Sequence, residues 1–186
     1  MKDKTVVITG ATSGLGRATA LQLAQKGASV VIIARSNTKV NEVIKEIEKE
    51  GGKGQSIISD LSSMKDTKEA AGSITYAVKR LDVLINNAGA HFPKYIETSE
   101  GFESTLALNY LSPFLLTHHL IEQMEQTASG YGEARIINVS SVMHKGPINW
   151  DDLNYKDTTY SSTSAYYQSK HLLTSFTYYL SRQLKE

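Results

Sequence analysis

The feature that most constrains the fold of this chain is the alternation of short apolar runs with longer helical patterns. The apolar runs are rich in Val and Ile and lie at residues 5–9, 28–34, 55–59, 82–86 and 135–140. Continuous runs of this kind are typical of strands covered on both faces of a sheet. Helical patterns separate them, at residues 14–26, 38–50, about 63–79, 99–127, and from about 163 to the end.

Strands and helices that alternate in this way predict a parallel sheet with right-handed connections and helices on both faces. We therefore expect an α/β doubly wound sandwich. A chain of 186 residues suits one core better than two, so residues 1–186 are predicted to form a single domain. The least regular stretch, residues 141–162, is expected to be an ordered loop or insertion.

The first predicted strand runs directly into a glycine-rich turn, TGATSGLGRA, with glycines at positions 10, 14 and 16. Glycine lets the backbone approach a ligand closely, and the N-terminus of the following helix attracts a pyrophosphate. A glycine pattern alone is a weak signal, and the alternative is a merely tight turn. Its place between a first strand and a first helix favours a dinucleotide site.

The end of the second predicted strand indicates which dinucleotide binds. An acidic residue there bonds the ribose hydroxyls of NAD(H), whereas a basic residue suits the 2′-phosphate of NADP(H). The chain has Ala34 followed by Arg35, without a carboxylate. Because arginine binds phosphate through two hydrogen bonds, NADP(H) is favoured over NAD(H). The alternative is that Arg35 is an ordinary solvated charge.

Two adjacent tyrosines precede a lysine in the segment AYYQSK at residues 165–170. Helical positions three and four apart share a face, so Tyr166 and Tyr167 can each lie near Lys170. Lowering the pKa of a phenol from about 10 to about 7 takes about 4 kcal/mol. An ammonium at about 4 Å supplies a similar energy at an effective dielectric of about 20. The local pattern does not choose between the two rings.

Five ordered motifs resemble the short-chain dehydrogenase/reductase family over almost the whole chain. They are TGATSGLG at 9–16, NNAG at 86–89, Asn109, NVSS at 138–141, and the Tyr166 to Lys170 unit. The flanking segments TSEGFE and LNYLSPFLLT look most like the retinol-dehydrogenase-like, NADP(H)-using branch. The resemblance implies a Rossmann fold and an oxidoreductase that transfers a hydride between NADP(H) and a carbonyl or alcohol substrate.

The resemblance also implies roles for individual residues. The family uses the tyrosine of a Y-x-x-x-K unit, which is Tyr166, and Tyr167 would then face helix packing or a subunit contact. Tyr166 would be the general acid/base, Ser141 would hold the substrate oxygen, and Asn109 would support a water path to Lys170. The local pattern does not say whether Ser140 or Ser141 faces the cleft. The implied catalytic residues are Asn109, Ser141, Tyr166 and Lys170.

The cofactor residues follow from the same resemblance. Asp60 and Leu61 would meet the adenine, and the segment from Asn87 to Gly89 would line the cofactor cleft. The full implied set is Gly10, Ser13, Gly14, Leu15, Gly16, Arg35, Asp60, Leu61, Asn87, Ala88, Gly89, Tyr166 and Lys170.

Composition excludes several classes of function. The 20 basic and 19 acidic side chains leave a net charge of +1, so no nucleic-acid or anionic-membrane partner is expected. The chain has no cysteine, which excludes a disulfide framework, a thiolate nucleophile and cysteine metal sites. Neither a signal-peptide pattern nor an apolar stretch of about 20 residues is present, so we expect a cytoplasmic protein without a membrane span.

The histidines are weak candidates for a site. His118 and His119 lack the spacing and the partner carboxylate of a metal site, so no metal is expected. His91 and His144 follow the NNAG and NVSS motifs, and they either border the substrate or are solvated loop residues. Trp150 either walls a pocket or caps the core.

The length of the chain leaves two functions open. Doubly wound folds typically have six strands, and the pattern gives five. The chain is either an NADP(H)-dependent oxidoreductase, as the family implies, or a truncated cofactor-binding or dimerising module without turnover. Trp150, Tyr155 and Tyr160 in the insertion favour a sizeable apolar substrate. The resemblance implies a homodimer or homotetramer formed through the helices at 99–127 and 163–185.

Overall fold

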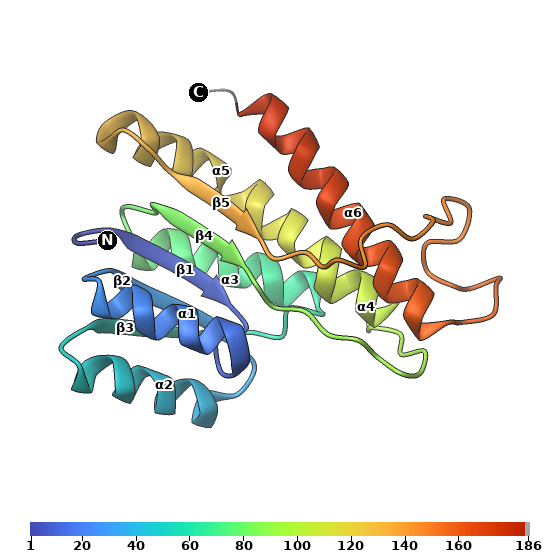
Figure 1. Cartoon of the computed structure of the whole chain (residues 1–186), viewed down its shortest axis with the longest axis horizontal. Helices are drawn as coiled ribbons and strands as arrows, with labels where there is room; N and C mark the ends of the chain where they lie inside the picture. The colour runs from blue at the N-terminus through green and yellow to red at the C-terminus, as the bar shows by residue number, and fades with distance from the viewer. Residues whose placement is uncertain (185–186) are drawn as a thin grey trace.

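Five parallel strands form one sheet in the order β3-β2-β1-β4-β5 (Figure 1). The structure is a computed structural model and describes residues 1–184. Every predicted strand is present, with ends within two residues of the predicted ones, and the doubly wound parallel sheet is confirmed. The strands are β1 (Thr5–Thr9), β2 (Ser29–Ala34), β3 (Lys53–Ile58), β4 (Val83–Asn86) and β5 (Arg135–Asn138).

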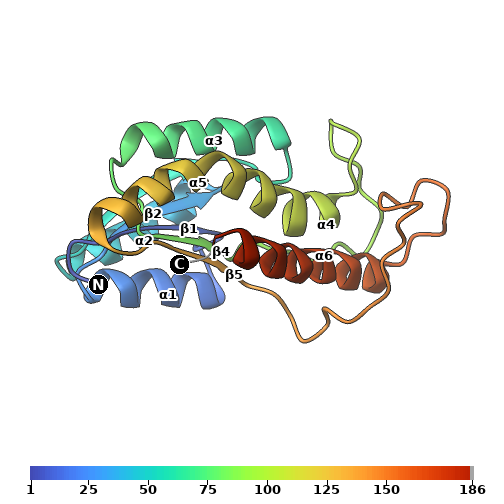
Figure 2. The ribbon, with the colours of Figure 1, turned by 90° about the horizontal axis from the view of Figure 1, so that it is seen from above.

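Helices cover both faces of the sheet (Figures 1 and 2). On one face lie α1 (Gly14–Gln25) and α2 (Asn37–Lys49); on the other lie α3 (Met64–Ala77), α5 (Ser112–Tyr131) and α6 (Ser162–Gln183). Successive strand residues point to opposite faces, so Val6 and Ile8 of β1 join the first layer while Val7 joins the second. No helix in residues 1–184 is both long and apolar enough to cross a lipid bilayer.

The long helix predicted at 99–127 is wrong at both ends. It begins at Ser104 as a short α4 (Ser104–Leu106), passes through a π-helical turn η1 (Ala107–Leu111), and continues as α5 to Tyr131. The carboxylate of Glu103 accepts hydrogen bonds from the N–H groups of Thr105 and Leu106, which sets the start. The last predicted helix ends at Gln183, and its final two predicted positions lie outside the described residues.

The prediction that all strands are covered on both faces is right for the central strands and wrong for the two edge strands. β1 and β4 are almost fully buried, whereas several residues of β3 and β5 are exposed. Ile136 of β5 packs beneath α5 and α6, while its neighbour Ile137 is 44% exposed on the opposite face. A run of apolar residues in the sequence therefore does not reveal which strand lies at the edge of the sheet.

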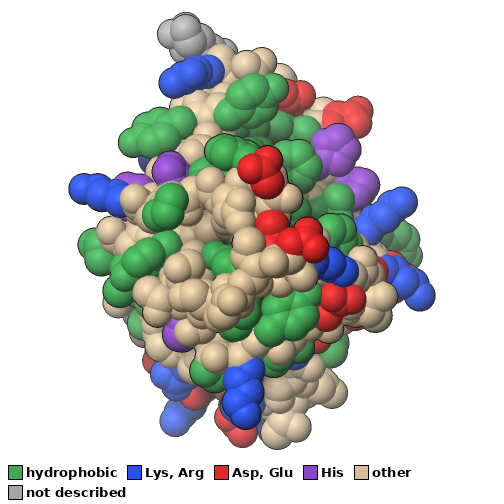
Figure 3. Space-filling model, turned by 90° about the vertical axis from the view of Figure 1, so that its right-hand side faces the viewer, with side chains coloured by type: hydrophobic (Ala, Val, Ile, Leu, Met, Phe, Trp, Pro, Cys, Tyr) green, Lys and Arg blue, Asp and Glu red, His purple; other side chains and the backbone are tan. Residues whose placement is uncertain are grey.

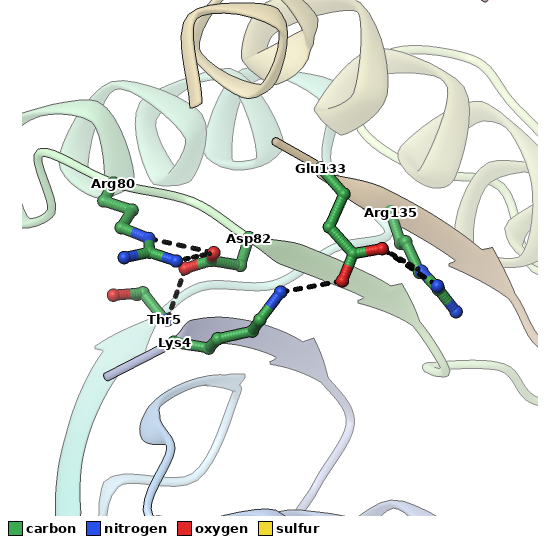
Figure 4. A network of polar contacts seen from close by, with 6 residues as sticks. All are labelled: Lys4, Thr5, Arg80, Asp82, Glu133 and Arg135. Carbon is green, nitrogen blue, oxygen red and sulfur yellow. Dashed lines mark hydrogen bonds and ion pairs between the residues drawn. The ribbon is translucent and has the colours of Figure 1, made fainter. Parts of the chain in front are cut away.

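Paired charges join the amino-terminal ends of β1, β4 and β5 (Figure 4). The buried carboxylate of Asp82 accepts a hydrogen bond from the Thr5 N–H at 2.8 Å and from Arg80 at 2.6 and 2.9 Å. Glu133 accepts from Lys4 and Arg135, each at 2.9 Å. Because a buried charge without a partner is costly, the contacts of Asp82 stabilise this end of the sheet, whereas those of the half-exposed Glu133 contribute less.

Candidate active site

A cavity of about 390 Å³ opens at the carboxyl-terminal ends of β1, β2 and β4. Chain order reverses in the sheet between β1 and β4, and α/β sheets bind ligands at such a switch point. The order of the strands in the sheet therefore determines where this cavity forms. Of the predicted cofactor residues, those that line it are Gly10, Ser13, Leu15, Gly16, Arg35, Leu61, Asn87, Ala88 and Gly89.

The glycine turn brings the start of α1 against the end of β4. A Cβ atom at Gly10 would lie 2.8 Å from the Cα of Ala88, so the close approach requires glycine there. Gly14 has open space around it but a φ of +54°, a conformation that other residues rarely adopt. Ser13, at the N-cap position of α1, forms no side-chain capping bond. The first N–H groups of α1 are thus available to an anion.

Two basic side chains line the β2 end of the cavity. Arg35 and Lys39 are exposed, and neither forms an ion pair with another residue among 1–184. Lys39 stands in the first turn of α2, which contains no acidic residue. A cation there opposes the helix dipole, and a bound anion would offset that cost. Sequence reasoning missed Lys39; its position four residues after Arg35, at a helix start, was the available signal.

The segment after β4 connects this cavity to the catalytic candidates. The N–H groups of Asn87 and Ala88 donate to the Thr9 hydroxyl at 2.9 and 2.8 Å, which fixes the segment against β1. A Cβ atom at Gly89 would lie 3.3 Å from the Lys170 Nζ. The Lys170 ammonium therefore lies directly beside the cavity wall.

Lys170 is almost fully buried, with 4% of its surface exposed. Its Nζ donates a hydrogen bond to the Val139 carbonyl at 2.9 Å and lies 5.9 Å from the ring centroid of Tyr166. Burial lowers the pKa of Lys170. The geometry thus places the buried Lys170 amine between the Gly89 wall of the cavity and the ring of Tyr166.

The two adjacent tyrosines face different partners. The Tyr166 ring lies near Lys170 and near the ring of His91. Tyr167 packs instead on Gly146, where an added Cβ atom would lie 2.5 Å from the Tyr167 Cβ. Tyr167 thus contacts the loop between β5 and α6, whereas the prediction was helix packing or a subunit contact.

The comparison with known proteins decides the family. The sequence profile of the short chain dehydrogenase family matches residues 4–186. The chain belongs to that family. It is 38% identical to human retinol dehydrogenase 13 over 98% of its length and 40% identical to human retinol dehydrogenase 11 over 100%. These identities confirm the predicted retinol-dehydrogenase-like branch.

The chain spans only part of its relatives. It covers 55% of retinol dehydrogenase 13 and 58% of retinol dehydrogenase 11. A solved metagenomic short-chain oxidoreductase in complex with NADP shares its fold, with a TM-score of 0.81 and 29% identity. That alignment covers 98% of the present chain and 77% of the metagenomic one.

Asn109 is buried inside η1 and is not among the residues that line the cavity. Its amide exchanges two hydrogen bonds with the backbone of Ala90, both at 2.9 Å, and donates to the Ser169 hydroxyl at 3.0 Å. The Ser169 hydroxyl in turn donates to the Tyr166 carbonyl at 2.8 Å. The Asn109 side chain therefore connects the segment after β4 with the Tyr166 segment of α6; its role in a water path stays a prediction.

The two serines of the NVSS motif differ in their surroundings. The Ser140 hydroxyl lies 2.7 Å from the Thr174 hydroxyl and 3.4 Å from the Lys170 carbonyl, so it faces α6. The Ser141 hydroxyl accepts a hydrogen bond from the Met143 N–H at 3.2 Å. Accepting that bond leaves the Ser141 hydroxyl proton free to bond a substrate oxygen.

Asp60 is used locally rather than at the cavity. Its carboxylate accepts hydrogen bonds from the N–H and hydroxyl of Ser62 at 3.0 and 2.8 Å, which shapes the turn before α3. Ser59 and Leu61 line the cavity on either side of it. An Asp60 contact with adenine stays a prediction, and Gly14, Asn109, Ser141, Tyr166 and Lys170 likewise lie outside the cavity lining.

The loop between β5 and α6 is held by two residues that sequence reasoning missed. The Asp152 carboxylate accepts hydrogen bonds from the N–H groups of Lys156, Asp157 and Thr158 and from the Thr158 hydroxyl. Burial alone would raise the pKa of Asp152, but these hydrogen bonds hold it below its ordinary value. Gln168 of α6 accepts from the Asn149 N–H at 2.9 Å and donates to the Leu153 carbonyl at 3.1 Å. The loop is thus fixed on the helix that carries Tyr166.

Proposed function

We propose that this chain is an oxidoreductase that transfers a hydride between NADP(H) and a carbonyl or alcohol substrate. The observation that carries the proposal is the buried Lys170 ammonium, which lies beside both Tyr166 and the Gly89 wall of the cavity. Membership of the short-chain dehydrogenase family supports the same chemistry. A nicotinamide seated in the cavity would supply or accept the hydride.

In this proposal Tyr166 is the general acid/base. It gives its phenolic proton to the substrate oxygen during reduction and takes it back during oxidation, and the Ser141 hydroxyl bonds the same oxygen. The Lys170 Nζ lies 5.9 Å from the ring centroid of Tyr166, and a cation on this side of the ring favours the phenolate form.

The preference for NADP(H) rests on the basic end of the cavity. Arg35 and Lys39 line it, and the capped N-terminus of α2 adds its dipole. All three favour a dianionic 2′-phosphate and offer nothing specific to ribose hydroxyls. The solved metagenomic relative carries NADP, which is consistent with this assignment.

The proposed substrate class is an apolar alcohol or aldehyde. Val142, Met143 and Trp150 in the β5–α6 loop are exposed by 90%, 46% and 69%. Figure 3 views the molecule from the end where this loop lies in Figure 1, and hydrophobic side chains are spread over that face among polar ones. The rings of Tyr155 and Tyr160, in contrast, pack on each other, with their centroids 5.5 Å apart. The names of the relatives, retinol dehydrogenases, point the same way.

The test is a direct assay of the chain with NADPH and a panel of carbonyl compounds. Turnover of long apolar aldehydes, with short charged carbonyls far slower, is the expected result. Nicotinamide oxidation is followed by absorbance, and NADPH binding is measured separately by titration. Binding without turnover of any member of the panel would contradict the proposal.

One observation favours a second candidate, a cofactor-binding or dimerising module without turnover. Pairing would use α5 and α6, where Phe114, Tyr178 and Tyr179 are exposed by 42%, 65% and 61%. Light scattering on the purified chain checks this, and we expect a homodimer or homotetramer.

A further inference from the structure

We propose that His91 is a positioning residue that holds the ring of Tyr166 for proton transfer. The inference rests on the proposed function, in which Tyr166 is the acid/base. The two rings form an edge-to-face contact, with centroids 5.8 Å apart and an interplanar angle of 84°. Edge-to-face geometry is the favoured arrangement for aromatic pairs, and it restricts rotation of the phenol.

The backbone just before His91 is fixed to the backbone of Tyr166 itself. The Asn109 amide holds both polar groups of Ala90, and it also bonds the Ser169 hydroxyl. The Ser169 hydroxyl donates to the Tyr166 carbonyl. Asn109 and Ser169 are both fully buried, so this connection is shielded from water. The positions of His91 and Tyr166 are thus set relative to each other.

The backbone just after His91 is held by a second hydrogen bond, from a residue that precedes α6. The Tyr160 hydroxyl donates to the Phe92 carbonyl at 2.9 Å. Tyr160 lies directly before Ser161, the N-cap residue of α6. The backbone on both sides of His91 is therefore connected by hydrogen bonds to α6 or to the residue just before its N-cap.

His91 itself is exposed, and its ring has no hydrogen bond within the part of the chain that the structure describes. The His91 ring contacts the Tyr166 ring edge to face, and the Lys170 Nζ lies 5.9 Å from the centroid of the same Tyr166 ring. A proton-transfer group must be aligned closely with the reacting oxygen, since small misplacements slow the reaction. The contact therefore acts on the chemical step and not on cofactor binding.

The experiment compares His91→Ala, which removes the ring, with His91→Phe, which keeps an aromatic ring without the imidazole. We expect His91→Ala to lower kcat about fivefold with NADPH affinity unchanged, and His91→Phe to stay within about twofold of the wild type. His118→Ala is the matched control, because it removes an exposed histidine from α5. All variants are expected to keep the wild-type melting temperature.

A second readout does not depend on turnover. The protein is labelled with 3-fluorotyrosine, and the Tyr166 signal is identified by its loss in Tyr166→Phe. We expect the fluorine signal to shift towards its unfolded position in His91→Ala and to remain displaced in His91→Phe. Equal kcat losses in the Ala and Phe variants, or an unmoved signal in His91→Ala, would overturn the inference. A signal that moves in a chain without turnover would sink the proposed function and leave the positioning role standing.

Discussion

At the amino-terminal ends of the strands, which we call the amino edge, the carboxylates of Asp82 and Glu133 pair with cations. At the carboxyl-terminal ends, the carboxyl edge, Arg35 and Lys39 pair with no carboxylate among residues 1–184. Asp82 is held by Arg80, and Glu133 is held by Lys4 and Arg135 (Figure 4). Arg35 and Lys39 instead line the cavity without an ion pair. The two groups of charges therefore differ in pairing and, for Asp82, also in burial.

Some charges of this chain stabilise the fold, and others are available to bind a ligand. A paired, buried charge contributes to the fold and cannot respond to a ligand without leaving its partner unpaired. An exposed cation in a cavity costs the fold little and is free to bind an anion. Substitutions at the amino edge should therefore change stability, and those at the carboxyl edge should change binding or turnover.

The largest expected effect is at the carboxyl edge and concerns turnover. Tyr166→Phe should lower kcat by about a thousandfold, because the general acid/base is lost. NADPH affinity and the unfolding free energy should stay within experimental error of the wild type. Steady-state kinetics and a fluorescence titration measure the two quantities. The matched control is Tyr167→Phe, which should retain most of the activity; equal losses would show that the wrong ring was chosen.

The next effect is at the amino edge and concerns stability. Asp82→Ala should lower the unfolding free energy by about 3 kcal/mol, since it removes the buried partner of Arg80 and of the Thr5 N–H. Urea denaturation measures the change, and the folded fraction should still bind NADPH normally. Arg135→Ala, at an exposed pair, serves as control and should cost less than 1 kcal/mol. Loss of NADPH affinity in folded Asp82→Ala would contradict the claim that charges at the amino edge affect stability and not binding.

A smaller effect tests the cavity cations. Arg35→Ala should weaken NADPH binding by about 30-fold and NADH binding by less than about threefold, because only NADPH carries the 2′-phosphate. Titrations with both nucleotides give the ratio. Lys49→Ala at the other end of α2 is the control, and neither variant should change stability. An unchanged preference in Arg35→Ala would remove the phosphate assignment.

The smallest effect concerns Lys170, a cavity-edge cation that is also buried. Its folded-state pKa is lowered by burial, so folding favours the neutral amine. The unfolding free energy therefore carries no penalty from Lys170 above its unfolded pKa of about 10.4. The penalty grows as the pH falls from that value to the folded pKa, because the unfolded chain then binds the proton more readily. Between those two values the unfolding free energy of the wild type should rise with pH more steeply than that of Lys170→Met. Parallel curves from denaturant titrations at several pH values would contradict this.

Much of the site was predictable because it depends on short segments. The turn needs glycine at Gly10 and Gly14 for backbone reasons, and the sheet brings that turn and Arg35 to one edge whatever the side chains do elsewhere. Lys39, Asp152 and Gln168 were missed because each acts through a loop or helix end whose geometry no short pattern encodes. The start of the long helix was misjudged for a similar reason, since the Glu103 cap only becomes visible in three dimensions.

The sequence by itself determined the parallel sheet, the place of its glycine turn and the basic residue after β2, because periodicity and turn chemistry are local properties of the backbone. The local pattern left two tyrosines near Lys170, and the family resemblance implied Tyr166. Only the tertiary structure decided which serine faces α6 and which apolar strands stand at an edge of the sheet. These outcomes depend on contacts such as that of Thr5 with Asp82, 77 positions apart. Such contacts form only when strands and helices pack together, so no short-range pattern carries them.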